Sequence, residues 1–366
     1  MIKFYDLYNL DKKIHNKILS KIKKIFNKGD YILGNEVFSF EKKFSKFVGS
    51  NYAVSCANGT DALTLSLKSL NLPTNSEVII PAMTYCSTAF SILNAGLKPV
   101  LVDLDINKPT IDINQIKKKI NSKTKVIMPV HLYGSTSNLS GIKKIIKSSK
   151  NKIYLIDDCA QAHGSLDDSS KNNKKIGSSA DISCFSLYPG KNLGAYGDAG
   201  IITTNSKKYY KILKNLRNLG SDKKYIHNRV GYNSRLDTIQ AAILNVKLKL
   251  LKENNKKRRI IAKSYEKFLD NKKITKLIYS KSCVFHQYII LSKQRKKLIK
   301  ILNHNKIQYA FHYPHAIHQL KALKKKFPRQ KYVNAERIAN EGISLPIDPN
   351  LKKNEIKKII KVINSF

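Results

Sequence analysis

Short apolar segments alternate with longer stretches of helical periodicity over the first two thirds of the chain. The apolar segments are rich in Val, Ile and Leu with little polar alternation, the pattern of strands buried on both faces; they span residues 77–83, 99–105, 125–134 and 153–158. The stretches between them, such as 61–71 and 139–149, have apolar residues at helical spacing. Alternating strands and helices predict an α/β fold on a largely parallel sheet, whose ligands bind beyond the carboxyl ends of the strands.

A change of pattern near residue 234 divides the chain. Residues 234–269 have the periodicity of one long helix, and the remainder mixes helical and strand-like segments. With 366 residues the protein is long enough for two domains. We predict a large domain over residues 1–245 and a smaller α+β domain over residues 246–366. The N-terminal stretch 1–26 predicts an amphipathic helix, assigned to the large domain but with the small domain as an alternative packing partner.

The composition is typical of a globular protein that is neither secreted nor membrane-bound. Hydrophobic residues make up 42% of the chain, no apolar run is long enough for a membrane span, and the N-terminal stretch lacks the apolar core of a secretory signal. The cysteines are odd in number, scattered and never in a CxxC spacing; they are Cys56, Cys86, Cys159, Cys184 and Cys283. We therefore expect a cytoplasmic protein without a disulfide framework, a metal site or a membrane partner.

The charge is extreme, because 68 lysines and arginines against 25 acidic residues give a formal net charge of +43. Such an excess would suit a nucleic-acid-binding protein, since phosphate backbones are bound by neutralising their charge. Here the excess is nearly all lysine, is spread over the whole length, and comes without a helix-turn-helix, RNP or finger pattern. We expect a solvated lysine surface and no nucleic-acid partner, although the positive field would attract an anionic, nucleotide-linked substrate.

Lysine-free intervals mark the interior, and one of them contains a single exception. Between Lys175 and Lys207 the only lysine is Lys191, within a segment of apolar, aromatic and glycine residues (183–200). Such neighbours would desolvate the ammonium and favour the neutral amine, the form that attacks a carbonyl carbon to form a Schiff base. On this segment alone, a buried lysine that extends to the surface or completes an ion pair is an equal alternative.

Two motifs in the first hundred residues are compatible with a phosphate-bearing aromatic cofactor. Gly59 and Thr60 open an amphipathic helix, whose N-terminal amides and dipole form an anion site. The alternative is plain N-capping by Asn58 or Thr60. Tyr85 follows the end of a predicted strand, where its ring could lie flat on an aromatic ligand or could belong to the core.

Acidic and hydroxyl residues stand near the ends of two further buried strands. Asp158 ends the segment 153–158, and because a buried carboxylate is costly unless paired, we expect a cationic partner such as a protonated pyridine nitrogen. Asp157 should face the opposite side in a structural role. The hydroxyl of Ser186 could donate to a phosphate or be satisfied by the backbone, and His163 is expected to be packed or hydrogen-bonded rather than an acid–base group.

Together these residues resemble the DegT/DnrJ/EryC1/StrS family of sugar aminotransferases that depend on pyridoxal 5'-phosphate (PLP). The resemblance covers nearly the whole chain and rests on eight landmarks in the family's order: YILGNEVFSFEKKFSKFVG (31–49), ANGTDAL (57–63), PVHLYGS (129–135), DDCAQAHG (157–164), FSLYPGKNLGAYGDAG (185–200), GYNSRLDTIQAAIL (231–244), HYPHAIH (312–318) and ISLPIDP (343–349). It implies the PLP-dependent transferase fold type I, with PLP as the cofactor and a homodimer with shared active sites.

The resemblance also implies roles for single residues. Lys191 matches the lysine that forms the Schiff base with PLP, Asp158 the partner of the pyridine nitrogen, and Gln161 the neighbour of the ring's phenolic oxygen. The ring-stacking aromatic matches Tyr85, and the phosphate ligands match Gly59, Thr60, Ser186 and, from the neighbouring subunit, Asn233. Substrate contacts match Tyr188, His312 and Tyr313, with ordinary packing in the small domain as an equal alternative for the last two.

The implied reaction is a ping-pong transfer of an amino group. L-Glutamate converts PLP to pyridoxamine 5'-phosphate, and a nucleotide-linked keto sugar then accepts the amine. The pattern is most similar to the branch that aminates C3 of dTDP-linked 3-keto-6-deoxyhexoses, and the alternative is C4 amination of a GDP- or UDP-linked 4-keto sugar. A sugar dehydratase on the same scaffold carries histidine at the position of Lys191, which argues against that activity.

Overall fold

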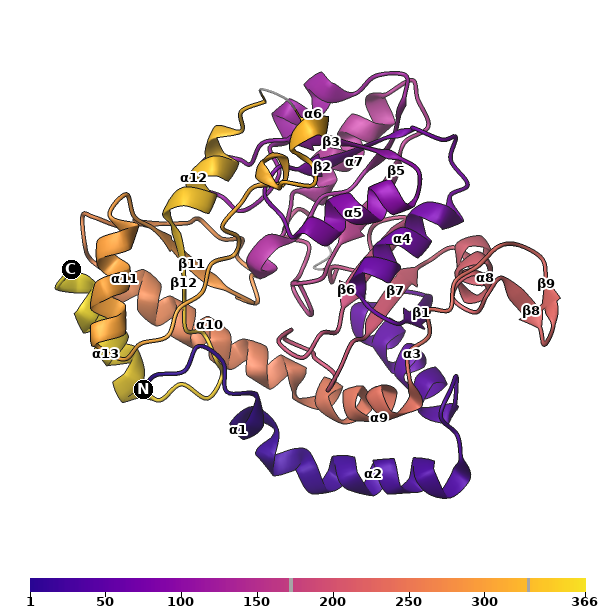
Figure 1. The fold of residues 1–366 in the computed structure, drawn as a ribbon, viewed down its shortest axis with the longest axis horizontal. Helices are drawn as coiled ribbons and strands as arrows, with labels where there is room; N and C mark the ends of the chain where they lie inside the picture. Colours follow the sequence, from indigo (N-terminus) through magenta and orange to yellow (C-terminus); the bar gives the residue numbers. More distant parts are fainter. Residues whose placement is uncertain (171–173, 328–329) are drawn as a thin grey trace.

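A seven-stranded sheet forms the centre of the protein (Figure 1). The computed structural model describes residues 1–170, 174–327 and 330–366. Strand β7 is antiparallel to β1 and β6, and the other neighbouring pairs are parallel. The predicted, largely parallel α/β sheet is therefore confirmed. In spatial order the strands are β1 (Tyr52–Cys56), β7 (Gly200–Thr204), β6 (Ile182–Ser186), β5 (Tyr154–Asp158), β4 (Thr124–Ile127), β2 (Glu77–Pro81) and β3 (Lys98–Val102).

Each of the four predicted strand segments overlaps one strand, in order β2, β3, β4 and β5. Most residues of these strands are buried, as expected for strands covered on both faces. The strands are shorter than the apolar segments because the segments continue into the loops at the carboxyl edge. Strand β4 ends at Ile127, shortly before Pro129, which has no N–H to donate to a neighbouring strand.

Helices cover both faces of the sheet, and alternate strand residues point to opposite sides. Val54 and Ile80 belong to one buried cluster, and their direct neighbours Ala53 and Ile79 belong to another. The first cluster includes residues of α4 (Gly59–Ser69), α5 (Cys86–Asn94) and α8 (Lys207–Leu216). The second includes residues of α3 (Asn35–Val48), α6 (Ile113–Lys119), α7 (Leu139–Ser148) and α9 (Thr238–Lys247). Helices α4 and α5 follow β1 and β2, so their N-termini lie at the carboxyl edge of the sheet.

A smaller antiparallel sheet lies in the C-terminal part, with the strand order β10 (Thr275–Lys276), β11 (Tyr288–Leu291) and β12 (Gly342–Leu345). Its core includes residues of α10 (Leu251–Phe268), α11 (Arg295–His304) and α13 (Lys353–Asn364). Helix α12 (Val333–Glu341) contacts β11 and β12, and its buried residues belong to the cluster that continues into the main sheet. This part has the α+β composition that was expected, while a domain boundary between residues 245 and 246 stays a prediction and falls within α9.

The helix predicted over residues 234–269 is interrupted. Helix α9 ends at Lys247, a 3₁₀ turn spans Leu248–Leu250, and α10 begins at Leu251. The two helices follow one another from the main sheet to the smaller one, along the lower side of the molecule in Figure 1.

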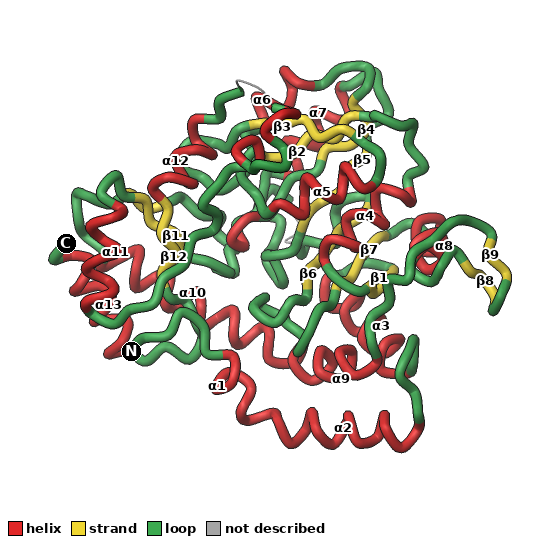
Figure 2. Tube along the Cα trace, in the orientation of Figure 1, coloured by secondary structure: helices red, strands yellow, loops and turns green. Residues whose placement is uncertain are grey.

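The N-terminal stretch is only partly helical, so the prediction of one helix over residues 1–26 is wrong. Ile2 forms a bridge to Ile307 at the smaller sheet, and α1 (Leu7–Asp11) begins only where the Asp6 side chain accepts a hydrogen bond from the backbone N–H of Asn9. After a 3₁₀ turn, α2 (His15–Lys28) runs beside α9 (Figure 2). There Ile18 packs against Ile243 and Val246, so this stretch contacts both parts of the chain.

A short hairpin of β8 (Ser221–Lys223) and β9 (Ile226–His227) projects from the main sheet, at the right of Figure 1. Tyr225, between the two strands, is 81% exposed, and Val230, shortly after the hairpin, is 93% exposed. Within the described ranges, no helix has both the length and the apolar character needed to cross a bilayer.

Candidate active site

The site-residue candidates of the main sheet gather at its carboxyl edge. Asp158 ends β5 and Ser186 ends the neighbouring strand β6, while Gly59 begins the helix that follows β1. Strands β1, β5 and β6 run in the same direction, because β7 is antiparallel to both of its neighbours. Segments far apart in sequence therefore end at one place, as parallel strands require.

The Asp158 carboxylate is buried, and each of its oxygens accepts one hydrogen bond. Its Oδ2 accepts from Thr88 Oγ1 at 2.9 Å and its Oδ1 from the backbone N–H of Ala160 at 3.1 Å. Burial raises the pKa of this carboxyl, and the two hydrogen bonds and the charge of Lys191 oppose that rise. In the described part of the chain no cation lies within ion-pair distance of Asp158, so a ligand would have to supply the partner that sequence analysis expects.

Lys191 is half-buried in a turn, with its backbone N–H donating to the Tyr188 carbonyl at 2.8 Å. Burial lowers the pKa of its ammonium to about 8, and Asp158 opposes this shift. Among residues 1–170, 174–327 and 330–366, none forms a hydrogen bond or ion pair with its Nζ. The ion-pair alternative thus has no partner there, and the amine is neutral in a substantial fraction of molecules near pH 8.

The N-terminus of α4 and the end of β6 form a narrow cradle. A Cβ added at Gly59 would lie 2.6 Å from Ser186 Cβ, so only glycine permits this approach. Thr60 Oγ1 donates to Ser87 Oγ at 2.8 Å, which brings three hydroxyl groups near one helix N-terminus. The capping alternative holds for Asn58, whose side chain accepts from the backbone N–H of Asp61 at 2.8 Å, but not for Thr60. A helix N-terminus flanked by hydroxyl groups suits a phosphate.

Two aromatic rings and an amide contact one another at the site. Tyr85 is 54% exposed, so it is not a core residue, and its ring centroid lies 5.4 Å from that of Tyr313. Gln161 Nε2 donates to Tyr313 Oη at 2.9 Å, and its Oε1 accepts from the backbone N–H of Tyr133 at 2.6 Å. These contacts place Tyr313, from the C-terminal part, beside the candidates of the main sheet. Tyr188 is 58% exposed on the turn before Lys191.

Two candidates have different surroundings. His312 Nδ1 lies 2.7 Å from Ser344 Oγ in β12, and its ring is stacked on Phe4 with a centroid distance of 6.0 Å. Burial lowers the pKa of His312 to about 4, with a further contribution from Lys191. These contacts are compatible with the packing alternative, and a role of His312 in substrate binding stays a prediction. Asn233 is exposed, and its backbone bridges to Asn218.

Two buried histidines, His163 and His286, lie near enough to Lys191 for its charge to lower their pKa values. His163 is fully buried against Phe185, with a centroid distance of 5.4 Å, and burial lowers its pKa to about 3. His286 is also buried, its Nδ1 lies 3.2 Å from the Asn192 amide oxygen, and burial and the charge of Lys191 lower its pKa. Both imidazoles are neutral at pH 7, so they add no positive charge around the amine.

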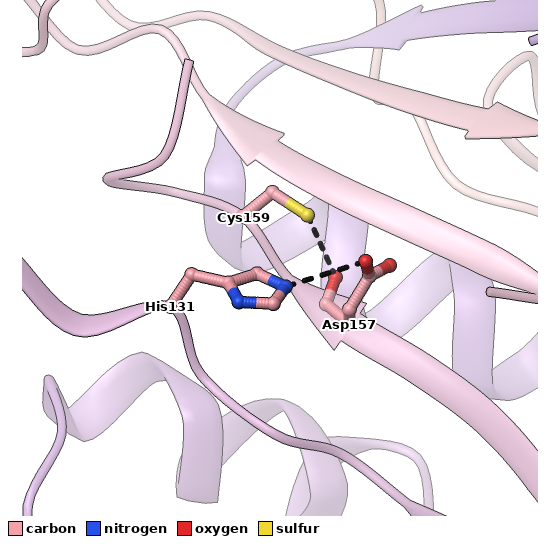
Figure 3. Close-up of side chains that lie close together, drawn as sticks. All are labelled: His131, Asp157 and Cys159. Atoms are coloured by element: carbon pink, nitrogen blue, oxygen red, sulfur yellow. Dashed lines mark hydrogen bonds and ion pairs between the residues drawn. The ribbon is translucent and has the colours of Figure 1, made fainter. Parts of the chain in front are cut away.

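A separate buried group lies on the far face of β5 (Figure 3). His131 Nε2 lies 3.4 Å from Asp157 Oδ2, and Cys159 Sγ donates to the Asp157 carbonyl at 3.6 Å. These three residue types can bind a metal. However, His131 Nδ1 accepts the backbone N–H of Ser137 at 3.1 Å, which leaves the ring proton on Nε2, the atom that faces Asp157. The contact is therefore a histidine–carboxylate hydrogen bond, in agreement with a structural role for Asp157.

Sequence analysis missed Thr88 and Ser87, which contact Asp158 and Thr60 from the first turn of α5. Their signal in the sequence is a pair of hydroxyl residues a few positions after the predicted strand over residues 77–83.

Comparisons with known proteins agree with this geometry. The model of the DegT/DnrJ/EryC1/StrS aminotransferase family matches residues 12–364. A protein of Aneurinibacillus thermoaerophilus named dTDP-3-amino-3,6-dideoxy-alpha-D-galactopyranose transaminase is 40% identical over 368 residues, covering 100% of this chain and 99% of the relative. A Pseudomonas aeruginosa protein named UDP-2-acetamido-2-deoxy-3-oxo-D-glucuronate aminotransferase is 35% identical over 367 residues and both chains are covered fully.

Solved structures give the same result. The crystal structure of S. venezuelae DesV in complex with a ketimine intermediate superposes with a TM-score of 0.95 at 30% sequence identity, covering 100% of this chain and 98% of that one. A family model that spans nearly the whole chain, together with relatives matched over their full length, settles the relationship. This chain belongs to the DegT/DnrJ/EryC1/StrS aminotransferase family.

Proposed function

We propose that this protein is a PLP-dependent aminotransferase that moves the amino group of L-glutamate to the keto group of a nucleotide-linked sugar. The observation that carries the proposal is the arrangement of Lys191 and Asp158. An amine without a hydrogen-bond partner in the described residues shares one sheet edge with a buried carboxylate that lacks a cation. Family membership supports the same reaction class.

The residues present fit PLP. When bound, this cofactor supplies an electrophilic carbonyl carbon and a pyridinium ring that withdraws electrons from the reacting carbon. Asp158 would hold the ring nitrogen, Tyr85 would cover a ring face and Gln161 would face the phenolic oxygen. The phosphate would be held at the cradle by Gly59, Thr60 and Ser186, where a side chain at position 59 would collide with Ser186.

Lys191 and Asp158 have complementary tasks. With a pKa of about 8, the Lys191 amine is available as a nucleophile near neutral pH and can take up or release a proton at Nζ. The Asp158 carboxylate would pair with the positively charged ring nitrogen, and burial would strengthen this interaction because little water screens it. Tyr313 and Gln161 fix each other through their hydrogen bond, which orients the amide.

The preferred substrate is a dTDP-linked 3-keto-6-deoxyhexose that is aminated at C3. The relative named as a dTDP-3-amino-3,6-dideoxy sugar transaminase supports this choice at 40% identity. The relative whose name contains UDP and a 3-oxo sugar supports the same carbon with another nucleotide. C4 amination of a GDP- or UDP-linked 4-keto sugar is the alternative. A dehydratase is disfavoured because Lys191 stands where that class has histidine.

We also propose a homodimer in which Asn233 reaches the phosphate of the neighbouring subunit. The exposure of Asn233 supports this, since its side chain is accessible to a second subunit. Tyr225 and Val230, which precede Asn233 in the chain, are exposed apolar surface that a second copy would bury.

Two experiments test the proposal. Reduction with borohydride should attach PLP covalently to the wild-type protein but not to Lys191→Ala, and retention of the adduct by the variant would contradict the role of Lys191. The substrate is tested by offering glutamate with dTDP-, UDP- and GDP-linked keto sugars made in situ, and by locating the new amine by mass spectrometry and NMR. Amination only at C4 would overturn the preferred substrate while leaving the reaction class in place.

A further inference from the structure

A chain of two threonine hydroxyls ends on the Asp158 carboxylate. Thr84, in the loop after β2, lies with its Oγ1 2.9 Å from Thr88 Oγ1, which in turn lies 2.9 Å from Asp158 Oδ2. Thr84 and Thr88 are 2% and 1% exposed, so water does not compete for these bonds. The chain therefore connects the ends of β2 and β5 beneath the candidate active site.

The charge of Asp158 determines which hydroxyl group donates in each of these hydrogen bonds. A carboxylate only accepts, so Thr88 must donate its single hydroxyl hydrogen to Oδ2, and Thr84 must then donate to Thr88. The backbone N–H of Ala160 satisfies Oδ1. If Asp158 were protonated on Oδ2, it would donate to Thr88, and the hydroxyl chain would reverse. The observed geometry is thus compatible with both states, and each hydrogen bond given to the carboxylate favours the ionised one.

The hydroxyl of Thr88 forms its hydrogen bond outside its own helix. Thr64 and Ser66 of α4 donate to backbone carbonyls of their own helix, at 3.0 and 2.7 Å, as serine and threonine commonly do in helices. The hydroxyl of Thr88 instead points out of α5 to a strand far away in sequence. Helix formation does not account for this bond, but the needs of a buried carboxylate do.

We propose that Thr88, held by Thr84, is a positioning residue that keeps Asp158 ionised, so that the proton shared with the pyridine nitrogen of bound PLP stays on the ring. The inference rests on the proposed function and deepens it. Without the Thr88 hydroxyl, Oδ2 loses its donor in a site where burial already favours the neutral acid. The proton then moves from the ring nitrogen to Asp158, and the ring becomes a weaker electron acceptor. No other bond forms or breaks.

The test compares Thr88→Val, which keeps the shape and removes the hydroxyl, with Thr88→Ser, which keeps the hydroxyl. The protonation state of the ring nitrogen is measured directly, by nitrogen-15 NMR of protein loaded with PLP labelled at that atom. We expect the protonated signal in the wild type and in Thr88→Ser, and a shift toward the unprotonated signal in Thr88→Val. The dissociation constant of PLP should rise by about tenfold in Thr88→Val, because a protonated Asp158 binds the ring nitrogen more weakly than the carboxylate does.

Two further variants keep the result interpretable. Thr64→Val removes a helical hydroxyl of the same kind that does not touch Asp158, so its nitrogen signal should match the wild type. Thr84→Val leaves Thr88 bonded to Asp158 and should give a smaller shift in the same direction, which serves if Thr88→Val fails to fold. An unchanged ring-nitrogen signal in folded Thr88→Val or Thr84→Val would overturn the inference about Thr88 and leave the proposed function in place. A wild-type protein that does not bind PLP would instead overturn the proposed function.

Discussion

Lys247 Nζ lies 2.7 Å from Asp11 Oδ2, and this buried ion pair joins the N-terminal stretch to the last residue of α9. Both side chains are almost fully buried, and the Lys247 ammonium also lies 5.0 Å from the centroid of the Tyr196 ring. Burial lowers the pKa of Lys247, and Asp11 opposes the shift. Because Tyr196 belongs to the segment that follows Lys191, the pair also supports the loop that holds the candidate nucleophile.

Breaking this pair on one side should destabilise the protein strongly. Asp11→Ala and Lys247→Met should each cost about 3–5 kcal/mol, since each leaves one charge buried without its partner. The double variant Asp11→Leu with Lys247→Met removes both charges and should recover most of that loss. Urea unfolding measures the effect, and two single variants within about 0.5 kcal/mol of the wild type would mean that the pair behaves like an exposed one.

Gly59→Ala should weaken PLP binding without unfolding the protein. The new methyl would meet Ser186 Cβ at 2.6 Å, and overpacking of this kind costs about 1–3 kcal/mol, here by opening the cradle. Titration of the apoprotein with PLP gives the dissociation constant. Gly190→Ala is the control, because its methyl would have its nearest contact at an ordinary 3.7 Å from the Tyr188 ring. If Gly59→Ala and the wild type bound PLP with equal affinity, the cradle would not be part of the phosphate-binding site.

Capture of PLP by the apoprotein should follow the ionisation of Lys191. Burial depresses the pKa of the ammonium to about 8, so the neutral amine accumulates as the pH rises through that value rather than near 10.5. The rate of covalent capture, followed by absorbance, should rise across this range and level off above it. Lys191→Ala should show no such phase. A rate that keeps rising up to the ordinary range of lysine would show that the site does not desolvate the amine.

Mixing two inactive variants tests the shared active site. Lys191→Ala and Asn233→Ala should each have little transaminase activity as homodimers. A heterodimer that pairs one subunit of each contains one site with both residues intact, so mixing after partial unfolding and refolding should restore activity. The control is a mixture of each variant with itself. Failure of the mixture to gain activity, with heterodimers demonstrated by mass spectrometry, would show that Asn233 serves its own subunit.

Much of the fold follows from local pattern. The segments that contain β2, β3, β4 and β5 are recognisable because strands covered on both faces need apolar residues on both sides, which leaves an uninterrupted signature in the chain. The isolation of Lys191 among apolar and glycine residues is also local, and so is the helix start at Gly59. Together with the resemblance to a family, these features were enough to name the fold class and the candidates at the sheet edge.

The start of the helical region near the N-terminus was mispredicted for a physical reason. Amphipathic spacing over residues 1–26 is satisfied locally by a helix, but Ile2 gains more by pairing with Ile307 and entering the smaller core, and Asp6 then fixes where α1 begins. The spacing of apolar residues near the N-terminus cannot predict this contact, because Ile307 lies about three hundred positions away in the chain.

The sequence by itself determined the class of fold, four of the seven strands of the main sheet, and which amine and carboxylate stand out chemically. Only the tertiary structure decided which groups surround them: that Thr88 serves Asp158, that Ser87 joins Thr60, and that Tyr313 reaches Gln161 from the C-terminal part. The reason is that periodicity depends on neighbours within a few residues, whereas these partners meet through the spatial order of the strands, which places β5 between β4 and β6.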